Sequence, residues 1–392
     1  MAKLGEVFPV IRNGASIKQK SGAGGFPITR IETISNRTVN RSKMGYAGIF
    51  DIEKYQDYVL QDGDILMSHI NSEAHLGKVA LYTKQGNEQI IHGMNLLMLR
   101  SNSKKLLPEY AKYYFESWSF LRQIQRITKK SVNQASFTVT ALKEVEIPCV
   151  DIDAQKEIVK RLQNLEQLIS LREQQLVKLD ELIKARFVEM FGNPKDNKKE
   201  WNRVPLKKVA EVRGRVGWKG YKKEDLQESG PLVLGATHLT ENGNIDLSSP
   251  VYLSRDKYEE SPEIMLHRND LVFTQRGNTI GKVGLVKEDI GEATINPCVL
   301  ILRPTNIHPI YLDVYFIMDE VKKDMWRLNA GSAQPMITQK GISEYLLMLP
   351  PIELQNQFAA FVERVDKQKQ TVQQSLEKLE LMKKALMQEY FG

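Results

Sequence analysis

DIDAQKEIVKRLQNLEQLISLREQQLVKLDELIKARFVEMFG, residues 151–192, is a helical pattern far longer than an ordinary globular helix. Its apolar residues recur in steps of four and three, interrupted at Arg172, so they form a narrow heptad seam. The seam residues are Ile158, Leu162, Leu165, Ile169, Leu176, Leu179 and Ile183. Gly192 supplies the positive-φ stop, and Asn193-Pro194 prevents continuation of the helix. The stretch predicts one long helix over residues 151–192.

The same pattern recurs 200 residues later, over residues 351–392, without a gap. From Val145 to Gly192, 11 of 48 positions are identical to their partners. The second seam consists of Phe358, Val362, Val365, Val372, Leu376 and Leu379. Because a lone seam would be exposed to water, we expect the two helices to pack as an antiparallel coiled coil. The polar residues Arg172, Lys369 and Lys383 interrupt the seams and are candidates for fixing the register.

The segments between the helices also repeat. The buried-strand signal at residues 62–68 matches that at 269–274, and Pro108 and Pro309 each open an amphipathic helix. These patterns predict an α+β fold with a pseudo-two-fold internal repeat of two similar mixed domains. The expected order is domain 1–150, long helix 151–192, domain 193–350 and long helix 351–392.

Composition narrows the class of protein. Only two cysteines occur, Cys149 and Cys298, which argues against a disulfide framework. The sequence has no apolar run of membrane-spanning length and no secretory signal pattern, so we expect a cytoplasmic protein.

The net charge is +7, and residues 1–150 carry 20 basic against 13 acidic side chains. Residues 195–223 add 11 basic residues against three acidic ones. A basic patch on each domain suits a polyanion, although an ordinary solvated surface is the simpler alternative.

With these repeats, the chain resembles a type I restriction–modification specificity subunit, in which two target recognition domains alternate with repeated helices. The resemblance rests on the tract Gly331–Gln334, the tract Leu349–Gln355 and their weaker first copy around Gln134, Ile147-Pro148 and Gln155. It implies that each domain reads one half of a split double-stranded DNA target, and that the helices hold the halves roughly 34 Å apart.

The resemblance also implies partners and cofactors. The helices would dock two modification (methyltransferase) subunits, and restriction (translocase/nuclease) subunits can join them. S-adenosylmethionine, ATP and Mg are expected on the partner subunits and not on this chain.

Motifs for catalysis are near misses. Asn296-Pro297-Cys298 lacks the second proline and the aromatic residue of an adenine methyltransferase motif. Gly277–Lys282 is one residue short of a P-loop and lacks its Ser/Thr. Asp313 with Glu320 and Lys322 has nuclease-like residue types, but they lie in a helical pattern where a strand would be needed. The six histidines have no ligand spacing, so no metal site is indicated. The chain is predicted to be non-catalytic.

The function that remains is recognition of DNA. Lys and Arg bind phosphates, while Arg, Asn and Gln read base edges, so we list residues of these types as candidates. The candidates in the first domain are Lys18, Lys20, Arg30, Asn36, Arg37, Arg41, Lys43, His69, Asn71, Lys129, Lys130 and Asn133. The candidates in the second domain are Arg213, Arg215, Trp218, Lys219, Tyr221, Lys222, Lys223, Gln275, Arg276 and Asn278. The best loop is Ser35–Lys43, which is basic and amide-rich without apolar periodicity. A stand-alone DNA-binding regulator and a coiled-coil interaction scaffold stay open as alternatives.

Overall fold

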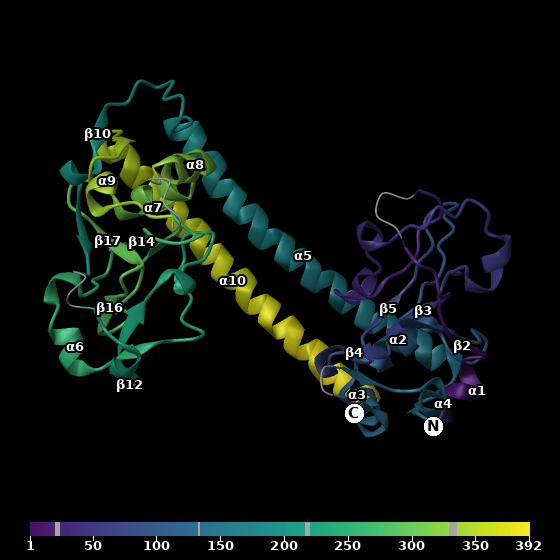
Figure 1. Cartoon of the computed structure of the whole chain (residues 1–392). Helices are drawn as coiled ribbons and strands as arrows, with labels where there is room; N and C mark the ends of the chain where they lie inside the picture. The colour runs from purple at the N-terminus through teal and green to yellow at the C-terminus, as the bar shows by residue number, and fades with distance from the viewer. Residues whose placement is uncertain (20–23, 132–133, 216–219, 329–334) are drawn as a thin grey trace. The chain divides into compact units, whose positions relative to one another are not determined.

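The computed structural model of the 392-residue chain describes residues 1–19, 24–131, 134–215, 220–328 and 335–392. It contains two compact units, which we call unit 1 and unit 2 (Figure 1). Unit 1 consists of Met1–Leu171 and Ser375–Gly392, and unit 2 consists of Arg172–Gln374. Each unit therefore takes one stretch from each long helix.

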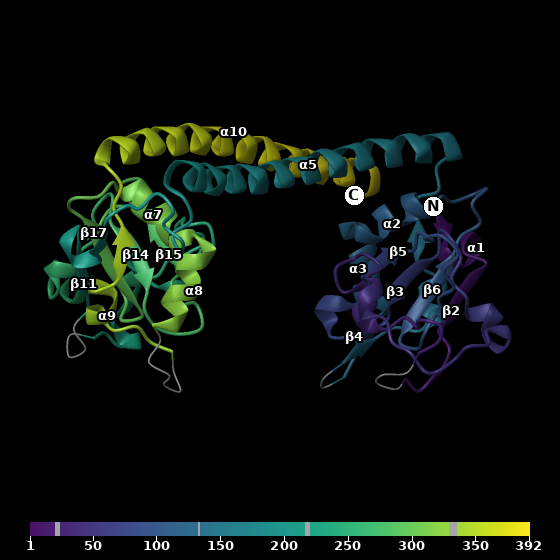
Figure 2. The ribbon, with the colours of Figure 1, turned by 90° about the horizontal axis from the view of Figure 1, so that it is seen from above.

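Unit 1 is built on a four-stranded antiparallel sheet in the order β2-β6-β3-β5. These strands are β2 (Val10–Asn13), β6 (Leu96–Arg100), β3 (Ile65–Ser68) and β5 (Val79–Leu81). Gly63, with φ of 83°, makes the left-handed turn that leads into the fully buried strand β3. Helices α2 (Pro108–Glu116) and α3 (Trp118–Ile127) follow, and α2 lies between this sheet and the long helices (Figure 2).

Unit 2 repeats this sheet in the order β11-β17-β14-β15. Its strands are β11 (Ala210–Gly214), β17 (Val299–Pro304), β14 (Leu271–Thr274) and β15 (Val283–Leu285). Helices α7 (Pro309–Ile317) and α8 (Asp319–Arg327) occupy the places of α2 and α3. The predicted strands at 62–68 and 269–274 and the predicted proline-opened helices are confirmed, as is the α+β class.

Shorter elements complete each unit. In unit 1 they are β1 (Ala2–Lys3), α1 (Leu4–Val7), β4 (Ile70–Asn71), β7 (Lys129–Lys130), β8 (Ala135–Ser136), α4 (Val139–Lys143) and β9 (Glu146–Ile147). In unit 2 they are β10 (Arg203–Pro205), β12 (Leu226–Leu234), β13 (Tyr252–Leu253), α6 (Arg255–Glu259), β16 (Ala293–Ile295), α9 (Gln339–Ser343) and β18 (Leu346–Met348). Strands β13-β12-β16 form a second sheet in unit 2.

A buried ion pair is duplicated in the two units. Arg100 on β6 binds the fully buried carboxylate of Asp64 at 2.7 Å, and Arg303 on β17 binds Asp270 at the same distance. Each carboxylate also accepts a backbone N–H, at 2.7 Å for Asp64 and 2.8 Å for Asp270. A buried carboxylate needs such partners, so this pair holds the turn before β3 and β14 in the same shape twice.

The long helices are α5 (Ile152–Phe191) and α10 (Ile352–Phe391), 40 residues each. A buried glutamine anchors the start of each one. The Oε1 atom of Gln155 accepts the Leu107 N–H at 2.9 Å, and that of Gln355 accepts the His308 N–H at 2.8 Å. Each helix therefore starts on the domain that precedes it in the chain.

The C-terminal end of each long helix contributes to a hydrophobic core, that of α5 in unit 2 and that of α10 in unit 1. Phe187 and Phe191 of α5 lie in the core of unit 2, against Tyr311 and Phe358. Phe391 of α10 lies in the core of unit 1 with its ring 5.1 Å from that of Tyr110. Phe187, Phe191 and Phe391 were not in the predicted seams, and they extend the buried face to the C-terminal ends of both helices.

The predicted seams are buried to different degrees. Leu162, Leu165, Leu179, Ile183, Phe358, Val362, Val365, Val372 and Leu376 are buried, while Ile158, Ile169, Leu176 and Leu379 are half-buried. The polar residues of the seams take partners. Lys383 pairs with Glu166 at 2.6 Å in unit 1, and Lys369 pairs with Asp180 in unit 2. Moving 14 residues along α5, from Glu166 to Asp180, moves the partner 14 residues back along α10, so both pairs follow one antiparallel register. Arg172 donates to Gln175 on its own helix at 2.8 Å.

Candidate nucleic-acid interface

In unit 1 a small sheet collects several of the predicted DNA-binding residues. Strands β4, β8 and β7 pair in that order, so that Asn71 and Lys130 both lie opposite Ala135. Lys129 and Lys130 are exposed, and Lys130 forms an exposed ion pair with Glu73 at 2.7 Å. An ion pair this exposed contributes little to stability, and a phosphate can replace its carboxylate.

His69, just before this sheet, is not available for phosphate binding. Its ring is buried edge-on to Phe137, and burial lowers its pKa to about 4. The imidazole is therefore neutral near pH 7. Its backbone carbonyl accepts the N–H of Phe137 at 3.2 Å and positions the strand that follows.

Unit 2 has the same edge with different side chains. Gln275, Arg276 and Asn278 follow β14 as His69 and Asn71 follow β3. The Gln275 carbonyl accepts the N–H of Ile337 at 2.9 Å, the counterpart of the bond between His69 and Phe137. The Gln275 amide donates to the Pro297 carbonyl at 3.0 Å, and Asn278 is exposed. We call these two places, residues 69–71 with 129–130 and residues 275–278, the reading edges.

The loop Ser35–Lys43 contains residues of two kinds. Arg41 binds Glu88 through two nitrogens, at 2.8 and 2.5 Å, which lowers the pKa of Glu88 to about 2. This guanidinium is a structural clamp between two loops. Asn36 and Lys43 are exposed and free to reach a ligand. Arg37, at φ 58°, lines a hollow of about 570 Å³ with Trp118 and the end of α10.

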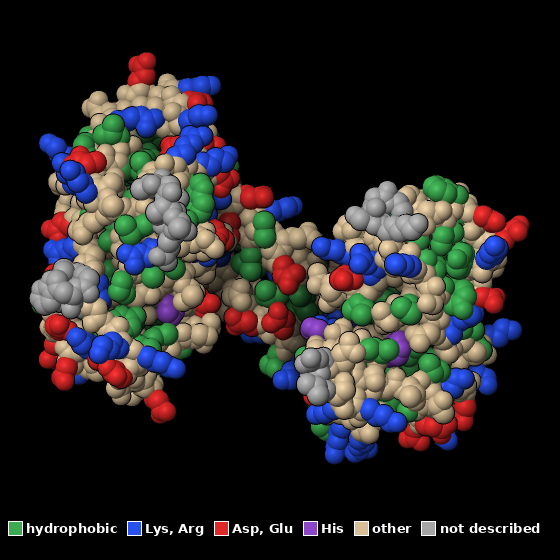
Figure 3. Space-filling view, viewed as in Figure 1, with side chains coloured by type: hydrophobic (Ala, Val, Ile, Leu, Met, Phe, Trp, Pro, Cys, Tyr) green, Lys and Arg blue, Asp and Glu red, His purple; other side chains and the backbone are tan. Residues whose placement is uncertain are grey.

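In the basic segment 213–223 of unit 2, the two arginines are engaged within the protein. Arg215 is buried, donates to the Ile295 carbonyl at 3.0 Å and lies over the ring of Tyr221 at 5.4 Å. Arg213 binds Glu211 and the Glu263 carbonyl. Lys222 and Lys223 are exposed, as are Lys18 and Arg30 in unit 1. Figure 3 shows a short row of Lys and Arg side chains on one face of unit 1.

Some predictions fall outside the described residues. These are Lys20, Asn133, Trp218, Lys219 and the tract Gly331–Gln334.

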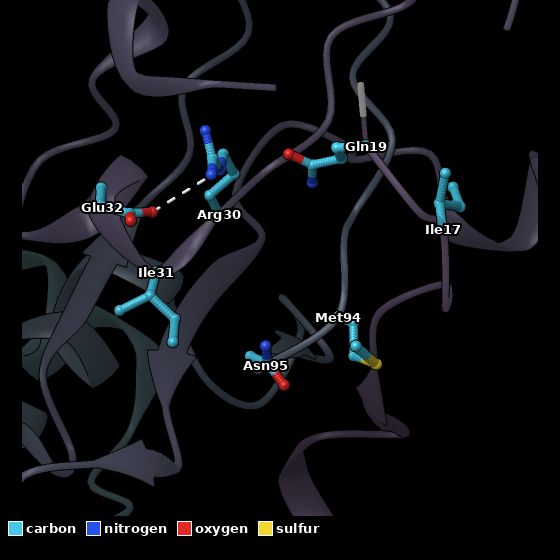
Figure 4. Close-up of a pocket in the computed structure, with 7 residues that line it drawn as sticks. All are labelled: Ile17, Gln19, Arg30, Ile31, Glu32, Met94 and Asn95. Atoms are coloured by element: carbon cyan, nitrogen blue, oxygen red, sulfur yellow. Dashed lines mark ion pairs between the residues drawn. The ribbon is translucent and has the colours of Figure 1, made fainter. Parts of the chain in front are cut away.

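Two adjoining hollows of unit 1 contain polar residues that sequence reasoning missed. The first, about 280 Å³, is lined by Gln19, Arg30, Glu32 and Asn95 among others (Figure 4). The second, about 260 Å³, shares Glu32 with the first and adds Asn71, His75 and Lys78. The sequence did contain a signal for Asn95: an asparagine two residues after Gly93 indicates a turn. Asn tolerates the left-handed φ of 76° that Asn95 adopts.

Catalytic chemistry finds no support in the described parts of the chain. Among those residues, no three His, Cys, Asp or Glu side chains are placed to hold a metal ion. Lys322 of the nuclease-like set binds Glu241, while Asp313 is buried against the long helices. In the same described parts, no helix is both long and apolar enough to cross a membrane.

Comparison with known proteins agrees with the duplicated architecture. The family model for the type I restriction modification DNA specificity domain matches residues 1–181 and 198–381. The MjaX specificity subunit of Methanocaldococcus jannaschii, a putative type I restriction enzyme subunit, is 30% identical, with 98% of this chain and 91% of the relative covered. The EcoKI specificity subunit of Escherichia coli is 26% identical over 40% of this chain and 33% of its own length.

Solved structures share the fold at lower identity. The S subunit of the type I restriction–modification system from M. genitalium matches with a TM-score of 0.56 and 13% identity, over 100% of this chain and 95% of that one. A chain from a study of complex assembly in the type I R-M system matches with a TM-score of 0.58 and 18% identity, over 100% and 96%. The chain belongs to the type I restriction–modification specificity subunits, the non-catalytic DNA-recognition components of these complexes.

Proposed function

We propose that residues 1–150 and 193–350 are two target recognition domains, each of which reads one half of a bipartite duplex DNA target. The observation that carries this proposal is the pair of reading edges. Asn71 follows β3 as Gln275, Arg276 and Asn278 follow β14, at the same place in the two sheets. In unit 1, Lys129 and Lys130 on β7 join this edge through the small sheet. A repeated scaffold with different amide and cationic side chains suits two readers of different base sequences.

The helix pair would set the spacer between the half-sites. Helices of 40 residues span about 60 Å at 1.5 Å per residue, enough to hold two half-sites one duplex turn apart. The two ion pairs that share one register would keep the helices from sliding, so the spacer would have one length.

The long helices would also dock two modification subunits. Leu168, Leu171 and Leu182 on α5 and Leu381 and Met382 on α10 are large apolar side chains that remain 44–66% exposed. Exposed apolar residues on a helix surface are typical of protein interfaces. S-adenosylmethionine, ATP and Mg would then bind to the modification and restriction subunits.

A salt-dependent gel shift, with and without the modification subunits, tests this function against the two alternatives. We expect weak binding by the chain alone and tight, specific binding with its partners, weakening steeply with salt. Tight specific binding by the chain alone would favour a stand-alone regulator. No binding in either condition would favour a scaffold without DNA contact.

Sequencing the methylated bases in a host that expresses the complex then tests bipartite reading. The expected motif has two specified halves separated by unspecified base pairs. A single contiguous motif would contradict two separate readers.

A further inference from the structure

The 280 Å³ hollow of unit 1 has an unusual set of side chains for a surface depression. Gln19 and Arg30 lie on one side, and Asn95 and Met94 lie on the other, with open space between them (Figure 4). The residues come from chain segments more than 60 positions apart, which only the fold brings together. We call Gln19, Arg30, Glu32 and Asn95 the amide hollow.

One polar atom in the amide hollow lacks a partner. The Oε1 of Gln19 is buried and accepts no hydrogen bond from any residue that the structure describes. A buried polar group without a partner is costly, and rotation of the half-buried Gln19 side chain would bring this oxygen to a ligand in the hollow that donates a hydrogen bond. The exocyclic amino groups of adenine and cytosine are donors of this kind.

The charges of the amide hollow favour base edges over the phosphate backbone. Arg30 and Glu32 form an exposed ion pair at 3.7 Å. A carboxylate repels phosphates, so Glu32 in the lining disfavours a site for the phosphate backbone alone. Base edges offer both donors and acceptors, which match a carboxylate, a guanidinium and two amides.

Basic residues flank the amide hollow where phosphates would pass. The adjoining hollow shares Glu32 and is lined by Lys78 and Asn71, and in the small sheet Asn71 and Lys130 lie on either side of Ala135. Amide side chains in the hollow and lysines beside it match a DNA-reading surface. In such a surface, phosphate contacts position the protein and base contacts specify the sequence.

Unit 2 uses the equivalent place differently. The carbonyl of His92 in unit 1 accepts the backbone N–H of Ala15, whereas the carbonyl of Ile295 in unit 2 accepts the buried guanidinium of Arg215. The next residue, Asn296, accepts the N–H of Cys298 with its Oδ1. In the described part of unit 2, Arg215 and the Oδ1 of Asn296 are therefore engaged within the protein.

We propose that the amide hollow reads base edges of the half-site bound by the first recognition domain, with Asn95, Gln19 and Glu32 as specificity-determining residues. This inference rests on the proposed function and adds the site at which one domain discriminates bases. The reading edge of the same unit then supplies the neighbouring phosphate contacts.

The test uses the complex of the whole chain with its modification subunits. Asn95→Gly removes the amide and keeps the left-handed backbone, because glycine adopts φ of 76° without strain. Gln19→Ala and Glu32→Gln probe the other two groups. Asn87→Ala, an exposed amide of the same domain outside both hollows, is the matched control. Thermal unfolding of each variant checks that the fold is kept.

We expect the three variants to change the methylated motif in one half-site only. Competition binding should show a roughly 5- to 150-fold loss of discrimination at one base pair, the factor for one bidentate base contact. Variants that fold and keep the parental motif and discrimination would overturn this inference alone. A parental complex with no methylated bipartite motif would overturn the proposed function, and this inference with it.

Discussion

At the scale of single residues, burial separates structural charges from those available to a ligand. Arg41, Arg213 and Arg215 looked like DNA-binding residues in the sequence, but their guanidinium groups bind Glu88, Glu211 and the Ile295 carbonyl. Asn36 and Lys43 from the same kind of loop are exposed. Residue type predicts that a basic surface exists, while only the fold decides which cations remain on it.

Arg41→Ala should therefore act on stability. Loss of the two-nitrogen clamp on the half-buried Glu88 is expected to lower the free energy of unfolding by about 1–3 kcal/mol. Lys43→Ala, two residues away and exposed, should change it by less than about 0.5 kcal/mol. Urea denaturation measures both, and equal effects of the two variants would contradict the clamp.

Asp313 predicts a pH dependence of stability. Burial on α7 raises its pKa to about 7, although Lys287 and Lys369 lie nearby and oppose the shift. Because the pKa of Asp313 is higher in the folded protein than in the unfolded chain, its contribution to the free energy of unfolding is fully present below pH 4. That contribution is lost as the pH rises to about 7. Asp313→Asn should remove that loss.

The measurement is urea denaturation at pH 5 and pH 8. The stability gain of Asp313→Asn over the parent should be about 2–3 kcal/mol larger at pH 8 than at pH 5. Asp196→Asn, at an exposed position, serves as the control. A gain that is the same at both pH values would show that Asp313 is ionised in the folded protein.

At the scale of elements, the sequence predicted what is periodic and missed what is tertiary. Heptad spacing located both long helices, and the Pro and Gly positions located α2, α7 and the turn before β3. The aromatic ends of the helices were missed because Phe187 and Phe391 fall outside the heptads and are buried by the domains. Gln19 and Asn95 were missed because no local pattern links residues so far apart.

The ion pair between Glu166 and Lys383 tests how the helices keep their register. Glu166 also accepts the hydroxyl of Tyr113 at 2.8 Å, so it joins α5, α10 and α2. A double-mutant cycle with Glu166→Ala and Lys383→Ala should give a coupling of about 1 kcal/mol or more. The exposed pair Asp153–Lys156 should give less than about 0.5 kcal/mol. Equal couplings would mean that the seam pair adds nothing beyond a surface contact.

At the scale of the whole molecule, duplication gives one chain two copies of the specificity domain and one helix pair. The sheets share strand order, and the Asp–Arg pairs and the glutamine anchors recur in both copies. So do the helix caps Thr138 and Thr338, whose hydroxyls accept the N–H groups of Ala141 and Gly341. Among the described residues, the polar groups of unit 2 near the equivalent place, Arg215 and Asn296, are instead bound within the protein. What is repeated supports the fold, and what differs between the copies is where we place the sequence preference.

Lengthening the helices should change the target spacer. Seven extra residues in each long helix, inserted near Gln174 and Gln374, keep the heptad seam and add about 10 Å of helix. We expect the unspecified spacer to grow by about three base pairs, with both half-sites unchanged, as read from methylated motifs. A spacer of unchanged length would rule out the ruler role.

The packing of Phe391 against Tyr110 has a consequence for how the chain is made. Most of unit 1 precedes unit 2 in the sequence, yet its core also takes residues 375–392, whereas unit 2 is one continuous segment, Arg172–Gln374. At about 5–20 residues per second, the ribosome adds the remaining residues after Leu171 in roughly 10–45 s. During this time the aromatic pocket around Tyr110 lacks its last member. The unit that starts first is thus completed last, and a prematurely ended chain lacks a piece of its N-terminal core.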